Sequence, residues 1–440
     1  MSKLRVSPQT RPLRGRIFVP GDKSISHRAV LLGALADGVS FIRNWLPAGD
    51  TLATLEVARA LGVPIEIDKK ETWAWDLRIE GQGLGRLKAP QGPLNCQNAG
   101  TAMRLLAGLM AGQSFPVVID GSKQLRKRPM RRIIDPLTQM GAKIFGSDGR
   151  APLHTTPARL HGITYEMPVA SAQVKSAILL AGLYAAGETR VHQPGPARDH
   201  TERMLAAMGI PIQSEGAWIT LPAKRPQSLM PLDLTVPGDF SSAAFPLVAA
   251  AIVPHSDITL VNVGANDTRT GLLEMLQAMG AQFSIQNERE TGGEPAVDIS
   301  VRFDELHAAD INGVTVVRGI DEFPILAVAM TQAAGISTVG DAAELRVKEV
   351  DRIAVLAGEL QKMDVPIEEK TDGFTIHGPI RPQGADVDSH DDHRLAMSLA
   401  IAGLVAKSPT RIEEAQCAHD SFPGFVEAMQ ALGADMAWEE

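Results

Sequence analysis

Val19-Pro-Gly-Asp-Lys-Ser-Ile-Ser-His-Arg28 is a polar stretch that leads directly into an apolar run, 29–36. The residues 16–19 predict a short strand, Pro20-Gly21 predicts a turn, and Ser24 or Ser26 is the expected N-cap of the helix that follows. The sequence therefore places a turn and a helix N-terminus directly after a strand.

This helix N-terminus is predicted to bind an anion. It offers free backbone N–H groups and the positive end of a helix dipole, and Lys23 and Arg28 lie beside it in the sequence. Phosphate is the anion that such a site suits best. The alternative is a surface lysine and arginine at an ordinary capped helix.

The same construction recurs along the chain. Six segments combine the end of a helix, a Leu/Met-Gly or Met-Asp pair and a short strand, at a spacing of roughly 70–85 residues. The glycine, or Asp364 in one copy, is the expected left-handed C′ residue of each helix. The six segments are 60–65, 139–144, 207–212, 278–283, 362–367 and 431–436.

A polar cluster introduces the apolar helix upstream of each ending. The six clusters are 22–28, 98–104, 171–175, 237–242, 321–324 and 391–394. Each repeat therefore reads strand, helix, strand, helix, strand, strand. In the third repeat these elements are predicted over 164–167, 173–186, 189–192, 200–208, 210–214 and 217–221.

Six repeats predict two similar domains of three repeats each, because Val19-Pro-Gly-Asp22 returns at the midpoint as Val236-Pro-Gly-Asp239. The sixth repeat stops at Trp438 without its last strand, which Lys3–Val6 can supply. We therefore predict that residues 1–20 belong to the C-terminal domain. The N-terminal domain is predicted over 21–237 and the C-terminal domain over 238–440.

Composition excludes several classes of protein. Of 440 residues, 44% are hydrophobic and 21% charged, as in ordinary globular proteins. A net charge of -8 argues against a nucleic-acid partner. No apolar run reaches the roughly 20 residues of a membrane helix, and no secretory signal is evident. Two cysteines, Cys96 and Cys417, suit a reducing cytoplasm.

The polar clusters carry the candidate chemistry. If the repeats are alike, helix N-termini from both domains converge on one cleft, and the clusters supply it with cations. A cationic site in an acidic chain favours a substrate with two anionic groups, or two anionic substrates. These cations are Lys23, Arg28, Arg104, Lys175, Lys348, Arg352 and Arg394, with more in 126–132.

Carboxylates also occur inside the clusters. Asp321 and Glu322 precede the fifth helix, and Glu349 lies between Lys348 and Arg352. A carboxylate among cations has a lowered pKa, which suits a base or a charge balancer. Helix capping by Asp321 and a surface ion pair of Glu349 are the alternatives.

The remaining motifs are uninformative or absent. For His27, His200 and His393 a structural role is favoured. No His/Cys/Asp/Glu set has zinc spacing, so no metal is expected. No Walker or dinucleotide-binding glycine motif occurs, so common nucleotide binding is not indicated.

Together these motifs resemble the 5-enolpyruvylshikimate-3-phosphate synthase family. The resemblance runs from about residue 13 to about residue 430. Its motifs are 20–28, 98–104, 127–130, 171–175, 198–202, 321–324, 345–352, 392–394 and 421–425.

The resemblance implies an α/β fold of two domains. Each domain holds three βαβαββ units arranged as an inside-out α/β barrel, with helix N-termini facing an interdomain cleft. It implies transfer of the enolpyruvyl group of phosphoenolpyruvate to the 5-hydroxyl of shikimate 3-phosphate in chorismate and aromatic amino acid biosynthesis. It also implies a monomer without metal or organic cofactor, and the two cysteines indicate a cytoplasmic location.

The resemblance also assigns residues. Lys23, Asp321 and Glu349 are the expected catalytic residues: Asp321 is the base at the hydroxyl, and Glu349 and Lys23 are both candidates for handling the methyl-carbon proton. Shikimate 3-phosphate is expected to bind Lys23, Ser24, Arg28, Ser171, Gln173, Arg198, Asp321 and Lys348. Phosphoenolpyruvate is expected to bind Lys23, Asn98, Gly100, Arg128, Gln173, Arg352 and Arg394, with Arg104 in support.

The chain departs from the family pattern at Asp420, where some members carry a lysine. One cationic contact to phosphoenolpyruvate is then missing, and Arg128, Arg352 and Arg394 must suffice. The motifs mix features of the two enzyme classes. In tolerant class-two enzymes the position of Gly100 often holds a methyl-bearing residue that crowds glyphosate; a glycine predicts that glyphosate inhibits competitively against phosphoenolpyruvate.

Two other functions are alternatives. The UDP-N-acetylglucosamine enolpyruvyl transferases have a similar fold, but they usually carry a reactive cysteine in a loop where this chain has 122–126 without one. A catalytically silent anion-binding protein of the same fold is the second alternative. The presence of Lys23, Asp321, Glu349 and Arg394 disfavours it.

Overall fold

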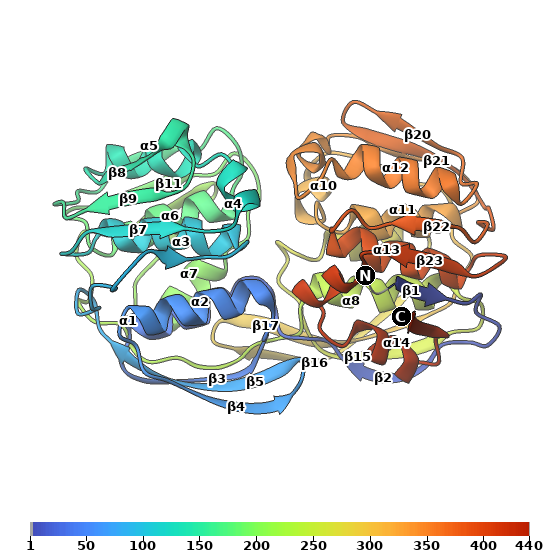
Figure 1. Cartoon of the computed structure of the whole chain (residues 1–440), viewed down its shortest axis with the longest axis horizontal. Helices are drawn as coiled ribbons and strands as arrows, with labels where there is room; N and C mark the ends of the chain where they lie inside the picture. Colours follow the sequence, from blue (N-terminus) through green and yellow to red (C-terminus); the bar gives the residue numbers. More distant parts are fainter. Residues whose placement is uncertain (1–2, 440) are drawn as a thin grey trace. The chain divides into compact units, whose positions relative to one another are not determined.

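The computed structural model describes residues 3–439, and their contacts divide them into two domains (Figure 1). The N-terminal domain consists of 21–236 and Glu290–Glu294, and the C-terminal domain of 3–20, 237–289 and 295–439. The chain passes from one domain to the other after Pro20 and again after Val236.

Each domain contains three repeats. In the N-terminal domain the first is β14 (Asp233–Thr235), α1 (Lys23–Leu35), β3 (Asp37–Trp45), α2 (Gly49–Ala60), β4 (Ile65–Glu71) and β5 (Ala74–Gln82). The second is β6 (Leu94–Asn95), α3 (Gly100–Ala111), β7 (Val117–Asp120), α4 (Lys123–Lys127), α5 (Arg131–Gln139), β8 (Lys143–Gly146) and β9 (Leu153–Thr156). The third is β10 (Thr164–Glu166), α6 (Ala172–Gly182), β11 (Thr189–His192), α7 (His200–Ala207), β12 (Gln213–Glu215) and β13 (Trp218–Leu221).

The C-terminal domain follows the same plan. Its first repeat is β2 (Arg14–Phe18), α8 (Phe240–Ile252), β15 (Asp257–Gly264), α9 (Gly271–Ala278), β16 (Phe283–Thr291) and β17 (Glu294–Arg302). The next is β18 (Asp310–Ile311), α10 (Val314–Arg318), α11 (Phe323–Thr331), β19 (Gly335–Val339), α12 (Arg352–Lys362), β20 (Ile367–Lys370) and β21 (Gly373–Gly378). The last is β22 (Asp386–Asp388), α13 (His393–Leu404), β23 (Thr410–Glu413), α14 (Phe425–Ala431), β24 (Met436–Glu439) and β1 (Lys3–Val6).

Within residues 3–439 the strands form six four-stranded sheets with one common topology. The third repeat is typical: β10 is parallel to β11, and β11 and β12 flank β13 antiparallel to it. In the last sheet β1 lies between β23 and β24, the position that the final strand of the repeat has elsewhere. The N-terminal strand thereby completes the sixth repeat.

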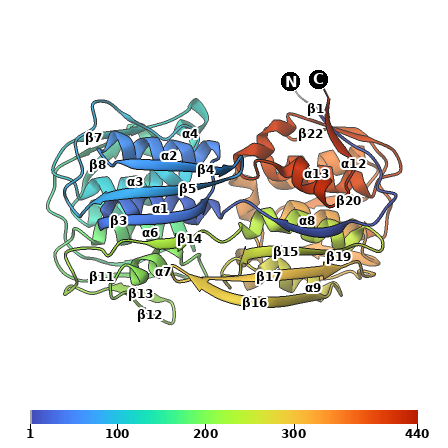
Figure 2. The ribbon, with the colours of Figure 1, turned by 90° about the horizontal axis from the view of Figure 1, so that it is seen from below.

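The first helix of every repeat is the buried one. Every residue of α8 and α11 is buried, as is nearly all of α1, α3, α6 and α13. Figures 1 and 2 show these helices enclosed by the sheets of their own domain. Each domain has its own apolar core. A helix that is buried on all sides needs apolar residues around its whole circumference, as the sequence of these helices provides. With the first helix of each repeat inside and the sheets outside, the predicted α/β fold of two inside-out barrels is confirmed.

The predicted helix endings are confirmed. Gly62, Gly141, Gly209, Gly280 and Gly433 have φ between 84° and 97°, and Asp364 has φ 58°. An L-residue pays a steric cost in this left-handed region, which glycine avoids and Asp tolerates.

Three local predictions need correction. Asp22, and neither Ser24 nor Ser26, is the N-cap of α1, because its carboxylate accepts the Ile25 N–H at 2.9 Å. The strand predicted at 16–19 is β2, and it pairs with β15 of the C-terminal domain while β14 takes its place beside β3. Helix α6 ends at Gly182, four residues early, because Arg225 binds the carbonyl oxygens of Gly182 and Ala185.

The tip of the β16–β17 hairpin was not anticipated. Residues Glu290–Glu294 fall within the predicted 238–440 but group with the N-terminal domain. Thr291 Oγ1 accepts the Thr235 N–H at 2.9 Å, and Glu294 Oε1 lies 2.8 Å from His200 Nδ1. Both His200 and Glu294 are 1% exposed. The hairpin tip is therefore held by one partly buried and one buried polar contact, which no local sequence pattern predicts.

Candidate active site

The start of α1 presents Lys23 next to an acidic partner. Its ammonium lies 2.6 Å from the Asp50 carboxylate on α2, and both side chains are 22% exposed. Ser24, the next residue, is half-buried, and its backbone oxygen accepts a hydrogen bond from Arg28 Nη1 at 2.9 Å. Lys23 is thus held by a charged partner and remains partly exposed, so a small molecule can reach it.

Arg28 and His27 are buried one turn further along α1. Burial lowers the pKa of Arg28 to about 10, against the opposing effect of Glu202 and Asp22, so it remains charged at neutral pH. Burial also lowers the pKa of His27 to about 3, and its Nδ1 lies 2.6 Å from Thr54 Oγ1. The structural role predicted for His27 fits a neutral imidazole.

A second group in the N-terminal domain gathers around the start of α3. Arg104 donates to Gln173 Oε1 at 2.6 Å, and Gln173 donates to Thr101 Oγ1 at 2.9 Å. A Cβ placed on Gly100 would lie 3.0 Å from Arg128 Nη1 and 3.1 Å from Arg104 Nη1. Two guanidinium groups therefore face the backbone at the N-terminus of α3, which is suited to an anion.

The other predicted residues of this domain lie at helix ends or loops. Ser171 is the N-cap of α6 and accepts the Val174 N–H at 3.4 Å. Asn98 accepts a hydrogen bond from Ser122 at 3.1 Å, and both Asn98 and Arg198 are half-buried.

Lys175 is not an anion-binding cation. Its side chain is 0% exposed and pairs with Glu202 at 2.5 Å, with further bonds to Gln193 and the Ala197 carbonyl. A buried lysine with these partners holds α6 to α7. The sequence prediction that it serves the site is wrong, because its neutralising partner comes from a distant helix.

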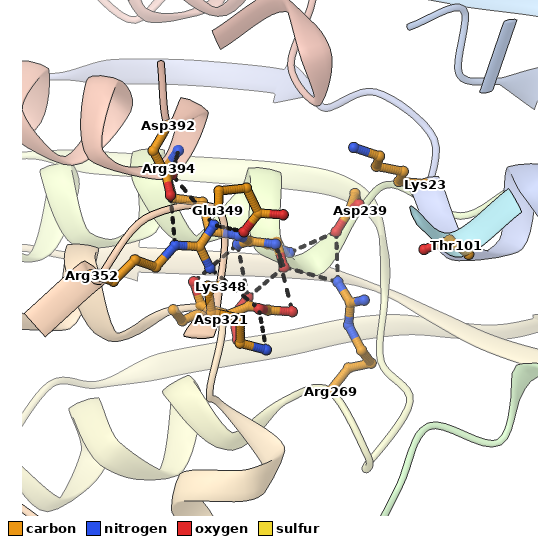
Figure 3. A network of polar contacts seen from close by, with 12 residues as sticks. Lys23, Thr101, Asp239, Arg269, Asp321, Lys348, Glu349, Arg352, Asp392 and Arg394 are labelled. Carbon is orange, nitrogen blue, oxygen red and sulfur yellow. Dashed lines mark hydrogen bonds and ion pairs between the residues drawn. The ribbon is translucent and has the colours of Figure 1, made fainter. Parts of the chain in front are cut away.

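In the C-terminal domain the carboxylate of Asp321 is surrounded by three cations (Figure 3). Lys348 and Arg352 each lie 3.6 Å from Oδ1, and Arg394 lies 3.7 Å from Oδ2. Arg394 also donates to the Asp321 backbone oxygen at 3.0 Å. Asp321 does not cap α11, whose N-cap is Glu322, so the alternative of an ordinary capping role is removed.

Arg352 joins this group to two more carboxylates. It lies 2.8 Å from Asp392 and 2.9 Å from Glu349, whose side chain is 33% exposed. Burial opposes the charge of Arg352, but Asp392, Glu349 and Asp321 together hold its pKa above the usual value. Asp392 is also buried, and Arg352 keeps the pKa of that carboxyl below its usual value. Glu349 is thus one end of a charged network and is accessible to a ligand.

Three residues of the network, Ser241, Arg269 and Asp239, were missed as functional candidates. Ser241 donates to Glu322, and it accepts from Arg269 at 2.9 Å and from Arg394 at 3.3 Å. Arg269 also pairs with Asp239 at 2.7 Å. Burial raises the pKa of Glu322. The signal that could have found them is the repeat of Val-Pro-Gly-Asp at 236–239 and the acidic pair at 321 and 322.

The sequence suggested a cationic site, but the charged network around Asp321 contains carboxylates as well as cations. Four cations are interleaved with five carboxylates, and a purely cationic cluster would be strained by like-charge repulsion. The network members are Lys348, Arg352, Arg394 and Arg269 with Asp321, Glu322, Glu349, Asp392 and Asp239. Such an arrangement orients its charges before any ligand binds.

Two searches over the described part of the chain gave negative results. Among residues 3–439 no group of three or more His, Cys, Asp or Glu side chains is arranged to hold a metal ion. None of the helices described is both long enough and apolar enough to cross a membrane.

Comparison with known proteins gives a consistent picture. The sequence matches the family EPSP synthase (3-phosphoshikimate 1-carboxyvinyltransferase) over residues 8–429. It is 48% identical to the 3-phosphoshikimate 1-carboxyvinyltransferase of Citrifermentans bemidjiense, covering 98% of this chain and 99% of the relative. It is 50% identical to the protein of that name from Acidithiobacillus ferrooxidans, covering 98% of each.

A solved structure agrees with these sequence matches. The EPSP synthase of Acinetobacter baumannii superposes with a TM-score of 0.91 at 42% identity, covering 100% of both chains. Full-length coverage at this identity leaves no part of either domain unaccounted for. This chain belongs to the EPSP synthase (3-phosphoshikimate 1-carboxyvinyltransferase) family.

Proposed function

We propose that this chain transfers the enolpyruvyl group of phosphoenolpyruvate to the 5-hydroxyl of shikimate 3-phosphate, releasing phosphate. The observation that carries the proposal is the Asp321 carboxylate, fixed among Lys348, Arg352 and Arg394 in a chain of this family. A base beside cations is what the reaction needs, because a hydroxyl must lose its proton next to anionic substrates.

The reaction is an addition followed by an elimination. In the addition the 5-hydroxyl oxygen bonds to C2 of phosphoenolpyruvate, its proton passes to Asp321, and the methylene carbon C3 gains a proton. This gives a tetrahedral intermediate. In the elimination C3 loses a proton and the bond between C2 and the phosphate oxygen breaks, which yields the enol ether and phosphate.

Glu349 and Lys23 are our candidates for protonating and deprotonating C3. Glu349 is 33% exposed and lies 2.9 Å from Arg352, while Lys23 is 22% exposed and lies 2.6 Å from Asp50. Both groups are accessible and both have a charged partner. Exchange of deuterium from solvent into C3 of phosphoenolpyruvate, measured for Glu349→Gln and Lys23→Met, separates their roles.

The binding roles divide between two anionic substrates. For shikimate 3-phosphate we assign Lys23, Ser24, Arg28, Ser171, Gln173, Arg198, Asp321 and Lys348. For phosphoenolpyruvate we assign Lys23, Asn98, Gly100, Arg128, Gln173, Arg352 and Arg394. The guanidinium groups of Arg128 and Arg104 beside Gly100 support the second set, and Asp420 lies exposed where some relatives have a lysine.

The direct test is phosphate release with both substrates. Asp321→Ala is expected to lower turnover by about 10²–10³-fold, because it removes a charged group that acts on the reacting hydroxyl. Asp386→Ala, which changes an exposed carboxylate on β22, is the matched control. Turnover of Asp321→Ala equal to the wild type, at equal thermal stability, would remove Asp321 from the mechanism.

The acceptor is tested in the same assay. We expect phosphate release with shikimate 3-phosphate and none with UDP-N-acetylglucosamine. The reverse pattern would favour the related transferase, and no release with either would favour a non-catalytic anion-binding protein.

Glyphosate is expected to inhibit competitively against phosphoenolpyruvate. The support is the absence of a side chain at Gly100, where an added methyl group would lie only 3.0 Å from Arg128 Nη1. Gly100→Ala is therefore expected to weaken glyphosate more than phosphoenolpyruvate. Unimpaired wild-type activity in millimolar glyphosate would contradict the prediction.

A cytoplasmic monomer is the remaining part of the proposal. Cys96 and Cys417 are buried free thiols, which suits a reducing compartment. Light scattering on the purified protein and fractionation of expressing cells test the two statements.

A further inference from the structure

The guanidinium of Arg28 is held along one edge by two buried hydroxyl groups from other helices. Arg28 Nε donates to Thr201 Oγ1 of α7 at 2.7 Å, and Nη2 donates to Ser176 Oγ of α6 at 2.8 Å. The two hydroxyl oxygens are themselves 2.7 Å apart. Ser176 and Thr201 are 0% and 1% exposed.

This arrangement leaves a defined part of Arg28 for a ligand. A guanidinium has five N–H groups in a rigid plane. Thr201, Ser176 and the Ser24 backbone oxygen accept three of them. The other two, one on each terminal nitrogen, belong to a plane whose orientation the hydroxyl pair has fixed, and bidentate binding of a carboxylate or phosphate depends on that orientation.

The hydroxyl pair is itself held in register by the residues beside it. Lys175 and Glu202, which adjoin Ser176 and Thr201 in the sequence, form an ion pair at 2.5 Å. Helices α6 and α7 are therefore joined at two consecutive positions, once by charge and once by hydroxyl groups. Because these two contacts are adjacent, a shift of α6 along α7 that separated the two hydroxyl groups would also break the buried ion pair.

We propose that Ser176 and Thr201 are positioning residues: they hold the Arg28 guanidinium in the orientation that binds an anionic group of shikimate 3-phosphate. The proposal rests on the proposed function, in which Arg28 contacts that substrate. Neither residue touches the reacting atoms. Their loss therefore weakens binding of shikimate 3-phosphate and leaves kcat and the KM for phosphoenolpyruvate close to wild-type values.

Steady-state kinetics on four variants test the proposal. Thr201→Val keeps the volume and removes the hydroxyl, and it is expected to raise the KM for shikimate 3-phosphate about 10-fold, the effect of one hydrogen bond to a charged group. Ser176→Ala is expected to act in the same direction, and Thr201→Ser to restore the wild-type KM. Thr189→Val is the matched control, since Thr189 is also fully buried in this domain but its hydroxyl makes no hydrogen bond within residues 3–439.

A double variant separates positioning from a general structural effect. If Thr201 acts through Arg28, then Thr201→Val adds no further increase in KM on an Arg28→Gln background. An equal increase in both backgrounds would overturn the proposal, as would a Thr201→Val enzyme whose KM matches that of Thr189→Val. Should Thr201→Val fail to fold, Ser176→Ala removes a single atom and is judged by the same criteria.

Failure of the proposed function gives a different result. A wild-type enzyme that releases no phosphate from the two substrates contradicts the function itself. A wild-type enzyme that is active, with Arg28→Gln raising the KM for shikimate 3-phosphate and the hydroxyl variants unchanged, contradicts only the positioning role. An unchanged KM in Arg28→Gln contradicts both the role assigned to Arg28 and the positioning built on it.

Discussion

The segments 19–22 and 236–239 have the same four residues, and both begin a helix of 13 residues. Counted from the aspartate, α1 then has Lys23, His27 and Arg28 where α8 has Phe240, Ala244 and Phe245. Phe245 packs against Phe425 in the apolar core, with the centroids of the two rings 6.2 Å apart. The same four-residue motif thus precedes both helices. The side chains that follow it decide whether the start of the helix is cationic or belongs to the apolar core.

The two aspartates also differ in their partners. Asp22 accepts the Ile25 N–H at 2.9 Å, as an ordinary N-cap does, and its charge also favours the charged form of the buried Arg28. Asp239 accepts the Ser241 N–H at 2.8 Å and also pairs with the buried Arg269 at 2.7 Å. In α8 the polar contacts are those of the cap Asp239, which pairs with Arg269, and of Ser241, which contacts Arg394 and Glu322. In α1 the polar side chains extend a full turn into the helix, to His27 and Arg28.

The largest expected effect concerns the first residue of each helix. Lys23→Met is expected to lower turnover by about 10²–10³-fold, because it removes a charged group from the proposed reaction site. Phe240→Leu, at the equivalent position of α8, is expected to keep wild-type turnover. Phosphate release and thermal unfolding measured on both variants check this, and a Lys23→Met enzyme of wild-type turnover would contradict it.

The cap aspartates are expected to differ in their effect on stability. Asp239→Ala removes the carboxylate that lies 2.7 Å from the buried Arg269 guanidinium, and breaking such a buried ion pair costs about 3–5 kcal/mol. Asp22→Ala removes a helix cap and costs about 1 kcal/mol. Urea denaturation followed by circular dichroism compares them, and equal destabilisation would show that the Arg269 pair adds nothing.

The glycines that precede the aspartates are expected to differ next. A Cβ on Gly21 would lie 2.1 Å from the Asn44 backbone oxygen, whereas a Cβ on Gly238 would lie 2.7 Å from a Val19 methyl group and 3.2 Å from the Asn262 oxygen. A side-chain methyl can move and a strand carbonyl cannot, so Gly21→Ala is expected to cost more than Gly238→Ala, by about 1–3 kcal/mol. Thermal unfolding of both variants measures the difference, and the opposite order would contradict this account.

At neutral pH the smallest expected effect is that of His27, a pH dependence of stability for which α8 has no equivalent residue. The pKa of His27 falls from 6.5 to about 3 on folding because the ring is buried. The unfolded chain therefore binds a proton that the folded chain does not, and stability falls as the pH drops below 6.5, by about 1.4 kcal/mol per pH unit down to about pH 3.

Urea denaturation of the wild type and of His27→Asn at a series of pH values isolates the contribution of His27 to the pH dependence of the free energy of unfolding. The difference in slope between the two proteins reports His27 alone, since the other titrating groups are common to both. Ala244, its equivalent in α8, contributes no such slope. Equal slopes for both proteins would show that folding does not lower the pKa of His27.

Much of the fold was predictable because its signals are local. The left-handed residue after each helix, such as Gly62 or Asp364, depends on backbone sterics at a single position. The need for a last strand in the sixth repeat followed from counting strands, and Lys3–Val6 lies in that place. The N-cap of α1 was misassigned because three residues with capping side chains, Asp22, Ser24 and Ser26, lie within five positions.

The candidate site was less predictable, because charge is neutralised across helices. Lys175 looks like a functional cation in the sequence, but Glu202 pairs with it 27 residues later, once α6 and α7 are packed. The role of Ser241 depends on Arg269, Glu322 and Arg394, which come from three separate elements. Nothing in the spacing of these residues indicates that they meet.

The repeat, the class of fold, the family and the identity of the charged residues follow from the amino-acid sequence, because each depends on local patterns or on motifs that can be read one at a time. Only the packed structure shows which charges are neutralised by buried partners and which remain partly exposed. Coulomb energies and burial depend on distances between residues far apart in the chain, so Lys175 becomes an internal tie while Asp321 gathers three cations around it.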